Sequence, residues 1–552
     1  MRERSATILC ALCLGLLSLG LFWHVAFFKT INLDDPWYLV SNQQVNQGLS
    51  WQGALDAFGS SQVTYWHPMA TLSAMADFTL FGPYPGPHHL SSLFFHAMAV
   101  ILFFLALKKM TGALWPSTLA ALLFAVHPVN LEAFCWLTQR KTILTGFFGA
   151  GTLLTYAYYA AKPGVGRYLG VFFLFALCVM SKPSATPLPL ALLLLDFWPL
   201  CRLDLGQNCG VQPDFGRASL SWLILEKVPL LFLSLGTTIM TFVTGIPYGG
   251  LNLLEGIPLL LRLENALLAL VTYLGKFFYS AGPTVYVPFP SSLSIRNVAG
   301  ALLVLFLVTA WVARNIKKSP HQAVGLLWFL LCMSPVIGVI QVGFFPAWAD
   351  RYAYLPFMGL YMAVAWTVHS WIMAAPRFKK WIGAMTMAWV VILGLSAWGQ
   401  SRYWANDRLL FSRAICHVPE SMIVQNNYAV ALIDDGLYDK AIFHYRKALS
   451  LALERMDSGF IADIHFNLGN AYLKLDDMQQ AEMEYKMAIQ SNPRLVQAYN
   501  NLGLVLKGQG LDWQARACFE KSLEIDPGFP DAKNNLEDMA QNLGAPSQAA
   551  ID

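Results

Sequence analysis

Long apolar stretches separated by short polar turns make up the first 400 residues of the chain. A helix needs roughly 20 mostly apolar residues to cross a bilayer. The first stretch is longer than the apolar part of a typical signal peptide, so we interpret it as a retained span. The pattern predicts eleven transmembrane helices, near residues 6–28, 89–107, 114–131, 143–161, 167–181, 184–200, 220–243, 298–314, 323–343, 352–374 and 381–399.

A further apolar stretch, at residues 259–280, is interrupted by Arg262, Glu264 and Lys276. Basic residues near the predicted span ends decide how we interpret it, because such residues collect on the cytoplasmic side of membranes. They all lie on that side only if 259–280 enters the membrane without crossing it. We therefore expect a cytoplasmic N-terminus and an extracytoplasmic C-terminus. In this arrangement four segments lie on the outer face: the loop 29–88, the turn 128–142, the hairpin at 181–183 and residues 349–351.

A different pattern follows the last apolar stretch, with the 34-residue period that is typical of tetratricopeptide (TPR) repeats. An earlier unit near residues 432–448 matches less regularly, and 531–543 resembles a capping helix. We expect an all-α protein with a membrane domain at 1–400, a TPR domain at 401–545 and a tail at 546–552. The two clearest repeats carry Leu468, Gly469, Tyr472, Ala481, Tyr485, Ala488 and Pro493, and then Leu502, Gly503, Leu506, Ala515, Phe519, Ser522 and Pro527.

Several asparagines in the repeats are candidates for holding an extended peptide backbone in a concave groove. The alternative interpretation is that they cap and solvate the helices. Both remain open at this point. The candidates are Asn427, Asn467, Asn470, Asn500 and Asn501.

The composition agrees with a membrane protein. Hydrophobic residues make up 56% of the chain and charged residues 13%, whereas a soluble protein is about a quarter charged. The net charge is only +4, and no basic patch with interleaved aromatic residues appears, so a nucleic-acid partner is not expected. Membrane lipids are the expected surroundings.

Two adjacent carboxylates, Asp34 and Asp35, follow the first span directly. Ionisable residues at a membrane edge are costly and are therefore functional candidates. Neighbouring carboxylates raise each other's pKa, which suits one of them to act as a base. The alternative is a helix cap near the interface.

Four cations lie at the outer membrane edge, where the positive-inside rule does not place them. Arginine and lysine in such positions indicate a bound anion such as phosphate. The alternative is that their side chains reach the lipid headgroups. The three histidines of the first outer loop, His67, His88 and His89, lack the regular spacing of metal ligands, so no metal site is predicted. The four cations are Arg140, Lys141, Lys182 and Arg351.

Motifs along almost the whole chain resemble the transmembrane-and-TPR protein O-mannosyltransferase-like family, within the type C glycosyltransferases. Each motif alone is weak, but their order is specific. They are Leu33-Asp34-Asp35 with Tyr38 and Asn42, Trp66-His67-Pro68, Phe81-Gly82 with Pro85 and His88, His127-Pro128 with Glu132, Trp136 and Arg140-Lys141, Ser181-Lys182-Pro183, Asp196 with Trp198-Pro199-Leu200, Tyr273-Leu274-Gly275-Lys276, Tyr286 with Pro288 and Pro290, and Asp350-Arg351-Tyr352 with Tyr354-Leu355-Pro356.

The resemblance implies that Asp34 or Asp35 deprotonates an acceptor hydroxyl, which attacks the sugar of a polyprenyl-phosphate donor with inversion. The four cations would stabilise the departing phosphate. His67, His127, Glu132 and Tyr354 would support the site, and the repeats would recruit a protein or peptide acceptor. No cofactor is firmly implied, although some type C enzymes use a divalent metal. The sequence looks closest to the bacterial branch, so we expect an inner-membrane protein with periplasmic repeats and leave mannose as one candidate sugar.

Two other functions compete with this enzyme. A catalytically inactive core could anchor a TPR scaffold for envelope assembly, but an anchor needs neither the paired aspartates nor the outer cations. A flippase for lipid-linked sugars would usually show matching internal halves with broken helices, and the sequence shows none. We therefore favour a membrane glycosyltransferase.

Overall fold

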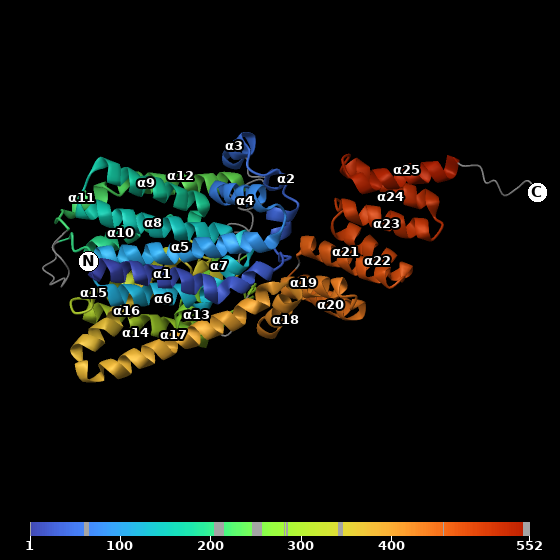
Figure 1. The fold of residues 1–552 in the computed structure, drawn as a ribbon. Helices are drawn as coiled ribbons and strands as arrows, with labels where there is room; N and C mark the ends of the chain where they lie inside the picture. Colours follow the sequence, from blue (N-terminus) through green and yellow to red (C-terminus); the bar gives the residue numbers. More distant parts are fainter. Residues whose placement is uncertain are drawn as a thin grey trace, which may run out of the picture. The chain divides into compact units, whose positions relative to one another are not determined.

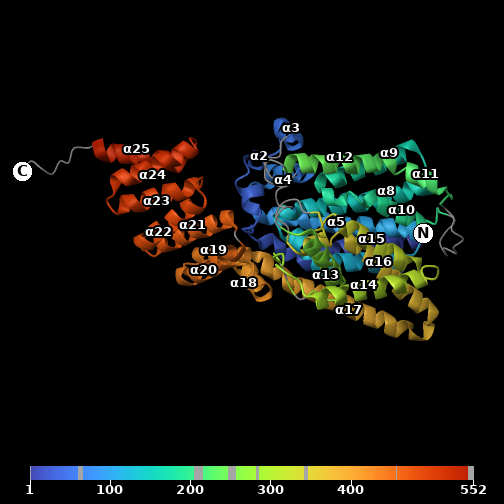
Figure 2. The ribbon, with the colours of Figure 1, turned by 180° about the vertical axis from the view of Figure 1, so that it is seen from behind.

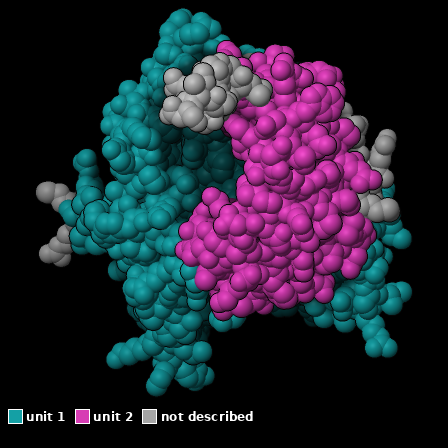
Figure 3. All heavy atoms as spheres, turned by 90° about the vertical axis from the view of Figure 1, so that its right-hand side faces the viewer, with its two compact units in different colours: residues 1–410 teal, residues 411–552 magenta. Residues whose placement is uncertain are grey.

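The computed structural model describes residues 2–59, 66–203, 215–245, 257–280, 282, 285–340, 346–455 and 457–544. These residues form helices and turns and include no strand. The chain divides into two compact units, residues 1–410 and 411–552, which are coloured separately in Figure 3. The division falls at residue 410, whereas the sequence pattern predicts it at residue 400.

The first unit is a bundle whose long helices lie side by side (Figures 1 and 2). Short 3₁₀ turns connect several of them. Its α-helices are α1 (Arg2–Phe22), α2 (Gln43–Asn46), α3 (Trp51–Gly59), α4 (Pro68–Phe81), α5 (Pro85–Thr111), α6 (Leu114–Val126), α7 (Leu131–Cys135), α8 (Arg140–Ala161), α9 (Val165–Ser181), α10 (Leu188–Phe197), α11 (Leu220–Leu225), α12 (Val228–Gly245), α13 (Leu259–Phe278), α14 (Ile295–Asn315), α15 (Pro320–Met333), α16 (Pro356–Ala374) and α17 (Lys379–Ser401).

Each of the eleven predicted spans overlaps a helix in the structure, and the span at 220–243 overlaps two, α11 and α12. By length and apolar composition, six of the described helices can cross a membrane, or seven if the bent pair Leu114–Val126 and Pro128–Cys135 counts as one span. The helices α9, α10 and α15 are apolar but shorter. The core is therefore a polytopic helical membrane domain, while the number eleven and the path of α13 remain predictions.

Small residues let two of the central helices approach closely. In the crossing of α15 and α16, a Cβ atom added to Gly325 would lie 2.4 Å from the backbone oxygen of Gly359. Glycine at such a contact is typical of helix packing within membranes, where close approach replaces the hydrophobic effect as the source of attraction.

A buried cluster of charges joins α8, α10 and the turn before α12. The Lys227 ammonium lies 2.5 Å from the Asp196 carboxylate, and the Arg202 guanidinium lies 2.8 Å from the Glu226 carboxylate. The Tyr156 hydroxyl donates to Asp196 at 2.6 Å. Two acids and two bases balance each other, so the cluster satisfies its own charges. We interpret it as structural.

The second unit is a stack of helix pairs. Successive repeats are formed by α19 (Met422–Asp434) with α20 (Tyr438–Arg455), α21 (Ser458–Lys474) with α22 (Met478–Ser491), and α23 (Val496–Gly508) with α24 (Asp512–Ile525), and α25 (Pro530–Gly544) follows. The helix α18 (Asp407–His417) begins in the first unit. This confirms the predicted TPR solenoid.

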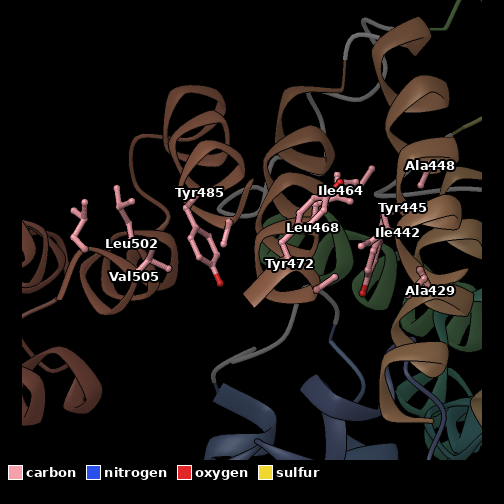
Figure 4. Packing of buried hydrophobic residues seen from close by; sticks show 14 of the residues in the cluster. Ala429, Ile442, Tyr445, Ala448, Ile464, Leu468, Tyr472, Tyr485, Leu502 and Val505 are labelled. Atoms are coloured by element: carbon pink, nitrogen blue, oxygen red, sulfur yellow. The ribbon is translucent and has the colours of Figure 1, made fainter. Parts of the chain in front are cut away.

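One continuous apolar core runs through the repeats, and Figure 4 shows part of it. Tyr485 packs where Gly469 leaves room for its ring, since a Cβ atom on Gly469 would lie 2.6 Å from that ring. Gly503 and Phe519 repeat this relationship one unit later, again at 2.6 Å. The 34-residue period in the sequence therefore reflects a packing contact that each unit repeats.

Candidate active site

A cavity of about 320 Å³ collects residues from several loops at one end of the membrane unit. Asp34 enters it from the segment after α1, and His67 from the start of α4. Lys141 lies in the first turn of α8, Lys182 directly after α9, and Arg351 in a 3₁₀ turn before α16. Because these helices run in alternating directions, their starts and ends meet at the same end of the bundle.

The structure gives the two adjacent aspartates different surroundings. Asp34 lines the cavity and is partly exposed. Asp35 is fully buried and does not line the cavity. Its carboxylate accepts hydrogen bonds from the Ile31 nitrogen at 2.9 Å, from the Thr138 nitrogen at 3.0 Å and from the Thr138 hydroxyl. Burial raises the pKa of Asp35 to about 6, against the opposing effect of these hydrogen bonds.

Two lysines face the cavity with their ammonium groups beside aromatic rings. The Lys141 ammonium lies 4.7 Å from the centre of the Tyr38 ring. The Lys182 ammonium donates a hydrogen bond to the Thr142 hydroxyl at 2.9 Å and lies 5.5 Å from the centre of the Tyr352 ring. Neither lysine forms an ion pair with a carboxylate among the described residues. Burial and the nearby charges of Lys141 and Arg351 lower the pKa of Lys182 well below its ordinary value, and an anion in the cavity would oppose that shift.

Arg351 is the third cation, and Glu132 fixes its position. The Glu132 carboxylate accepts a hydrogen bond from the Arg351 backbone nitrogen at 2.8 Å and a second one from its guanidinium. The guanidinium also lies 4.9 Å from the Tyr352 ring centre and 5.3 Å from that of Trp136. Glu132 is buried and does not line the cavity, so its geometry suits orientation of Arg351 rather than contact with a substrate.

The structure does not bring the predicted cation Arg140 to this cavity. Its guanidinium lies 2.7 Å from the Asp77 carboxylate, and both side chains are 7% exposed. Asp77 is an acidic residue within the apolar segment 68–81, which is the signal that points to it in the sequence. The remaining Arg140 hydrogen bonds go to the His88 backbone oxygen and to the hydroxyls of Ser73, Ser91 and Ser92.

Two other predicted support residues also lie away from the cavity. His127 donates from Nε2 to the Phe277 backbone oxygen at 2.9 Å and accepts at Nδ1 from the Val129 nitrogen at 3.2 Å. The Tyr354 hydroxyl lies 2.7 Å from Nδ1 of His96. Both side chains are buried, and their described contacts are those of packing residues.

His67 differs from these residues because it does line the cavity. Burial lowers the pKa of His67 well below its ordinary value, and the nearby charges of Lys141 and Lys182 lower it further. The ring is therefore neutral near physiological pH. A neutral imidazole can take part in a hydrogen bond without adding charge to the site.

The cavity combines a charged side with an apolar one. Three basic side chains, Lys141, Lys182 and Arg351, line it beside one acid, Asp34, and Arg351 is also paired with Glu132 behind the cavity wall. The donor set suits an anion better than a divalent metal, which needs several oxygen ligands. No group of three potential metal ligands gathers anywhere among the described residues. The apolar side consists of Phe242, Pro335, Val336 and Ile340.

In the repeats, each candidate asparagine forms a hydrogen bond with another asparagine, in most cases on a neighbouring unit. The Asn467 amide donates to Asn426 at 3.1 Å, and the Asn501 amide donates to Asn470 at 2.9 Å. The Asn500 side chain accepts from Asn535 at 2.9 Å. Asn427 accepts from Asn426 at 3.1 Å. The first two bonds connect the first helices of successive repeats, the third connects α23 to α25, and the last lies within α19. A role of these asparagines in peptide binding stays a prediction.

Comparison with known proteins finds family models that match the repeats and relatives that match most of the chain. Family models described as tetratricopeptide repeat match residues 420–492 and 496–529. The human protein named "Protein O-mannosyl-transferase TMTC3" is 22% identical over 531 residues, covering 88% of this chain and 56% of that protein. The human protein named "Protein O-mannosyl-transferase TMTC1" is 24% identical, covering 80% of this chain and 54% of that protein. The chain thus spans about half the length of the curated relatives it matches.

Proposed function

Because this chain belongs to the transmembrane-and-TPR protein O-mannosyltransferase-like family, we propose that it is a membrane glycosyltransferase with a lipid-linked donor. The donor is a sugar on a polyprenyl phosphate, and the acceptor is a hydroxyl group of a protein. One observation carries the proposal: a single cavity is lined by Asp34 and by three cations from separate parts of the chain. A scaffold has no use for this arrangement.

In the proposed reaction, Asp34 accepts the proton of the acceptor hydroxyl as its oxygen attacks the anomeric carbon. The bond from that carbon to the phosphate oxygen breaks on the opposite face, so the configuration inverts and polyprenyl phosphate leaves. Negative charge grows on the phosphate during this step. Lys141, Lys182 and Arg351 stabilise it, and removing one such group typically costs about 10²–10³ in rate.

The apolar side of the cavity fits the lipid part of the donor. Phe242, Val336 and Ile340 supply apolar surface beside the cations, so a phosphate and the first isoprene units can be held together. A free sugar nucleotide would leave this surface exposed to water. Mannose is the sugar to test first.

Asp35 acts in this proposal as a positioning residue. Its bonds to Ile31 and Thr138 hold the turn that carries Asp34 against the segment before α8. Lys141 lies three residues after Thr138 in the chain. The same contacts therefore fix the distance between the base and one of the phosphate-binding cations.

We place the cavity and the TPR repeats on the periplasmic side of a bacterial inner membrane, where the repeats recruit or orient the acceptor. A cysteine at exposed Lys533 should then react with a membrane-impermeant thiol reagent in intact spheroplasts. A cysteine at exposed Arg377, on the predicted cytoplasmic side, should react only after lysis. Both are made in a background without the accessible native cysteines. The reverse labelling pattern would invert the orientation.

The activity is tested by transfer of radiolabelled sugar from polyprenyl-phosphate mannose, and then from other polyprenyl-phosphate sugars, into membrane proteins. The wild type is compared with Asp34→Asn. The matched control is Asp56→Asn in the same outer loop, because Asp56 pairs with Gln52 and does not line the cavity. Label that requires Asp34 but not Asp56 supports the enzyme. No transfer from any donor by folded protein would favour the scaffold.

A further inference from the structure

A second cavity, of about 440 Å³, lies at the opposite end of the membrane unit from Asp34. It is lined by the first turns of α1, the last turns of α5 and the end of α8. The chain directions explain the separation. The start of α5 lies at the end of α1, since a Cβ atom on Gly86 would lie 2.2 Å from the Ala26 backbone oxygen. The end of α5 therefore lies beside the start of α1.

The charge of this second cavity is positive. Arg4, Lys108 and Lys109 line it together with one acid, Glu3, so the lining side chains carry a net charge of +2. Lys108 uses part of its charge, because its ammonium lies 2.6 Å from the Glu3 carboxylate. It also donates to the Gly112 backbone oxygen at 2.5 Å. Arg4 and Lys109 form no ion pair among the described residues.

Two aromatic side chains mark the depth of this end in the membrane. Tyr158 lines the cavity and is 51% exposed, and its ring centre lies 5.5 Å from the Lys109 ammonium. Trp115, in the first turn of α6, is 73% exposed. Exposed tryptophan and tyrosine at helix ends are typical of the headgroup region of a bilayer.

An apolar surface leads from the cavity along the outside of α1. Arg4, Ile8, Leu12 and Leu16 follow at four-residue intervals, which places them on one face of the helix. Ile8, Leu12 and Leu16 are all more than half exposed. A ligand with an anionic head in the cavity can therefore lay an acyl chain along this face. A free anion would not use it.

We propose that the cavity between α1, α5 and α8 is a binding site for an anionic phospholipid. Arg4 and Lys109 contact its phosphate, Lys108 is held in place by Glu3, and one acyl chain lies on Ile8, Leu12 and Leu16. A zwitterionic lipid carries its own cation and gains less from a positively charged site. The proposal does not depend on the proposed glycosyl transfer.

The test is native mass spectrometry of the detergent-solubilised full chain, titrated with dioleoyl-phosphatidylglycerol or dioleoyl-phosphatidylcholine. We expect the phosphatidylglycerol adduct at about tenfold lower lipid concentration. An Arg4→Gln/Lys109→Gln variant should bind phosphatidylglycerol about thirtyfold more weakly, since it removes two cations and each contributes roughly 1 kcal/mol near a membrane surface. An Ile8→Ser/Leu12→Ser variant should weaken both lipids.

The matched control is Lys379→Gln/Lys380→Gln, which removes the same charge from exposed positions at the start of α17. It should bind phosphatidylglycerol as the wild type does. Equal binding of both lipids, or unchanged binding by the Arg4→Gln/Lys109→Gln variant, would overturn the proposal. So would displacement of the lipid by millimolar inorganic phosphate, which would identify a simple anion site instead. Unchanged size-exclusion elution shows that the variants are folded.

Discussion

The carboxylate of Asp35 accepts hydrogen bonds from both the backbone nitrogen and the hydroxyl group of Thr138, 103 residues further along the chain. This contact fixes Asp35 in the protein interior. Its neighbour Asp34 consequently lines the cavity that also holds Lys141 and Lys182. Of two adjacent, identical residues, one is thus held in the interior and the other faces the cavity.

Replacement of Asp34 by Asn should abolish transfer while leaving the fold intact. The amide cannot accept the hydroxyl proton, and loss of a general base typically costs about 10²–10⁴ in rate. Asp34 is partly exposed, so its thermal unfolding midpoint should change little. Initial transfer rates and thermal unfolding measure the two effects. A normal rate in this variant would remove Asp34 from the mechanism.

The pH dependence of transfer should report on Asp35. With a pKa of about 6, its carboxylate is ionised above that pH and accepts its three hydrogen bonds, whereas below it a proton occupies one acceptor site. Transfer should therefore fall as the pH drops through about 6. Thr138→Val removes a hydrogen bond that lowers this pKa, so the midpoint should move to higher pH. An unmoved midpoint would assign the acid limb to another group.

Replacement of Lys182 by Met should affect the transfer rate, whereas replacement of Arg140 by Met should affect stability. Lys182→Met should lower the transfer rate about 10²–10³-fold, because it removes a cation from the phosphate site. Arg140→Met should instead reduce stability by about 3–5 kcal/mol, because it leaves Asp77 buried without its partner. Rates and unfolding free energies are measured for both variants. If Arg140→Met were stable and inactive, Arg140 would belong to the donor site.

Glu132 and Arg351 should act as one unit in a double-mutant cycle on the transfer rate. Glu132→Gln weakens the hold on the Arg351 guanidinium and backbone, so it should reduce transfer even though Glu132 does not line the cavity. When Arg351 is already Met, the same change should matter little. Independent, additive losses would show that Glu132 acts in some other way.

A methyl group at Gly503 should destabilise the repeats. Replacing Gly by Ala within a helix normally stabilises it by about 0.5–1 kcal/mol, but a Cβ atom here would lie 2.6 Å from the Phe519 ring. Such overpacking costs about 1–3 kcal/mol, which is more than the helix gains, so the Gly503→Ala variant should be less stable than the wild type. Gly508→Ala in the same helix is the control, since nothing lies within 4 Å of its added Cβ atom. Thermal unfolding of the full chain compares the two variants, and equal midpoints would contradict the close contact.

Much of the architecture could be predicted because it follows from repeated local patterns. An apolar stretch that is long enough to cross a bilayer indicates a membrane helix wherever it lies in the chain. The 34-residue period records the contact that each repeat makes with the next. Each of the eleven predicted spans therefore overlaps a helix in the structure. The candidate cations were also visible locally, because charge at an outer membrane edge is unusual.

What the sequence by itself determined, then, is the division into a helical membrane part and a TPR solenoid, and a short set of polar residues worth testing. Only the tertiary structure decided which of them share a site. Arg140 and Lys141 are neighbours, yet successive residues of a helix point about 100° apart. One side chain therefore meets Asp77, and the other meets the cavity of Asp34. The partners come from distant segments, so no local pattern could distinguish the two residues.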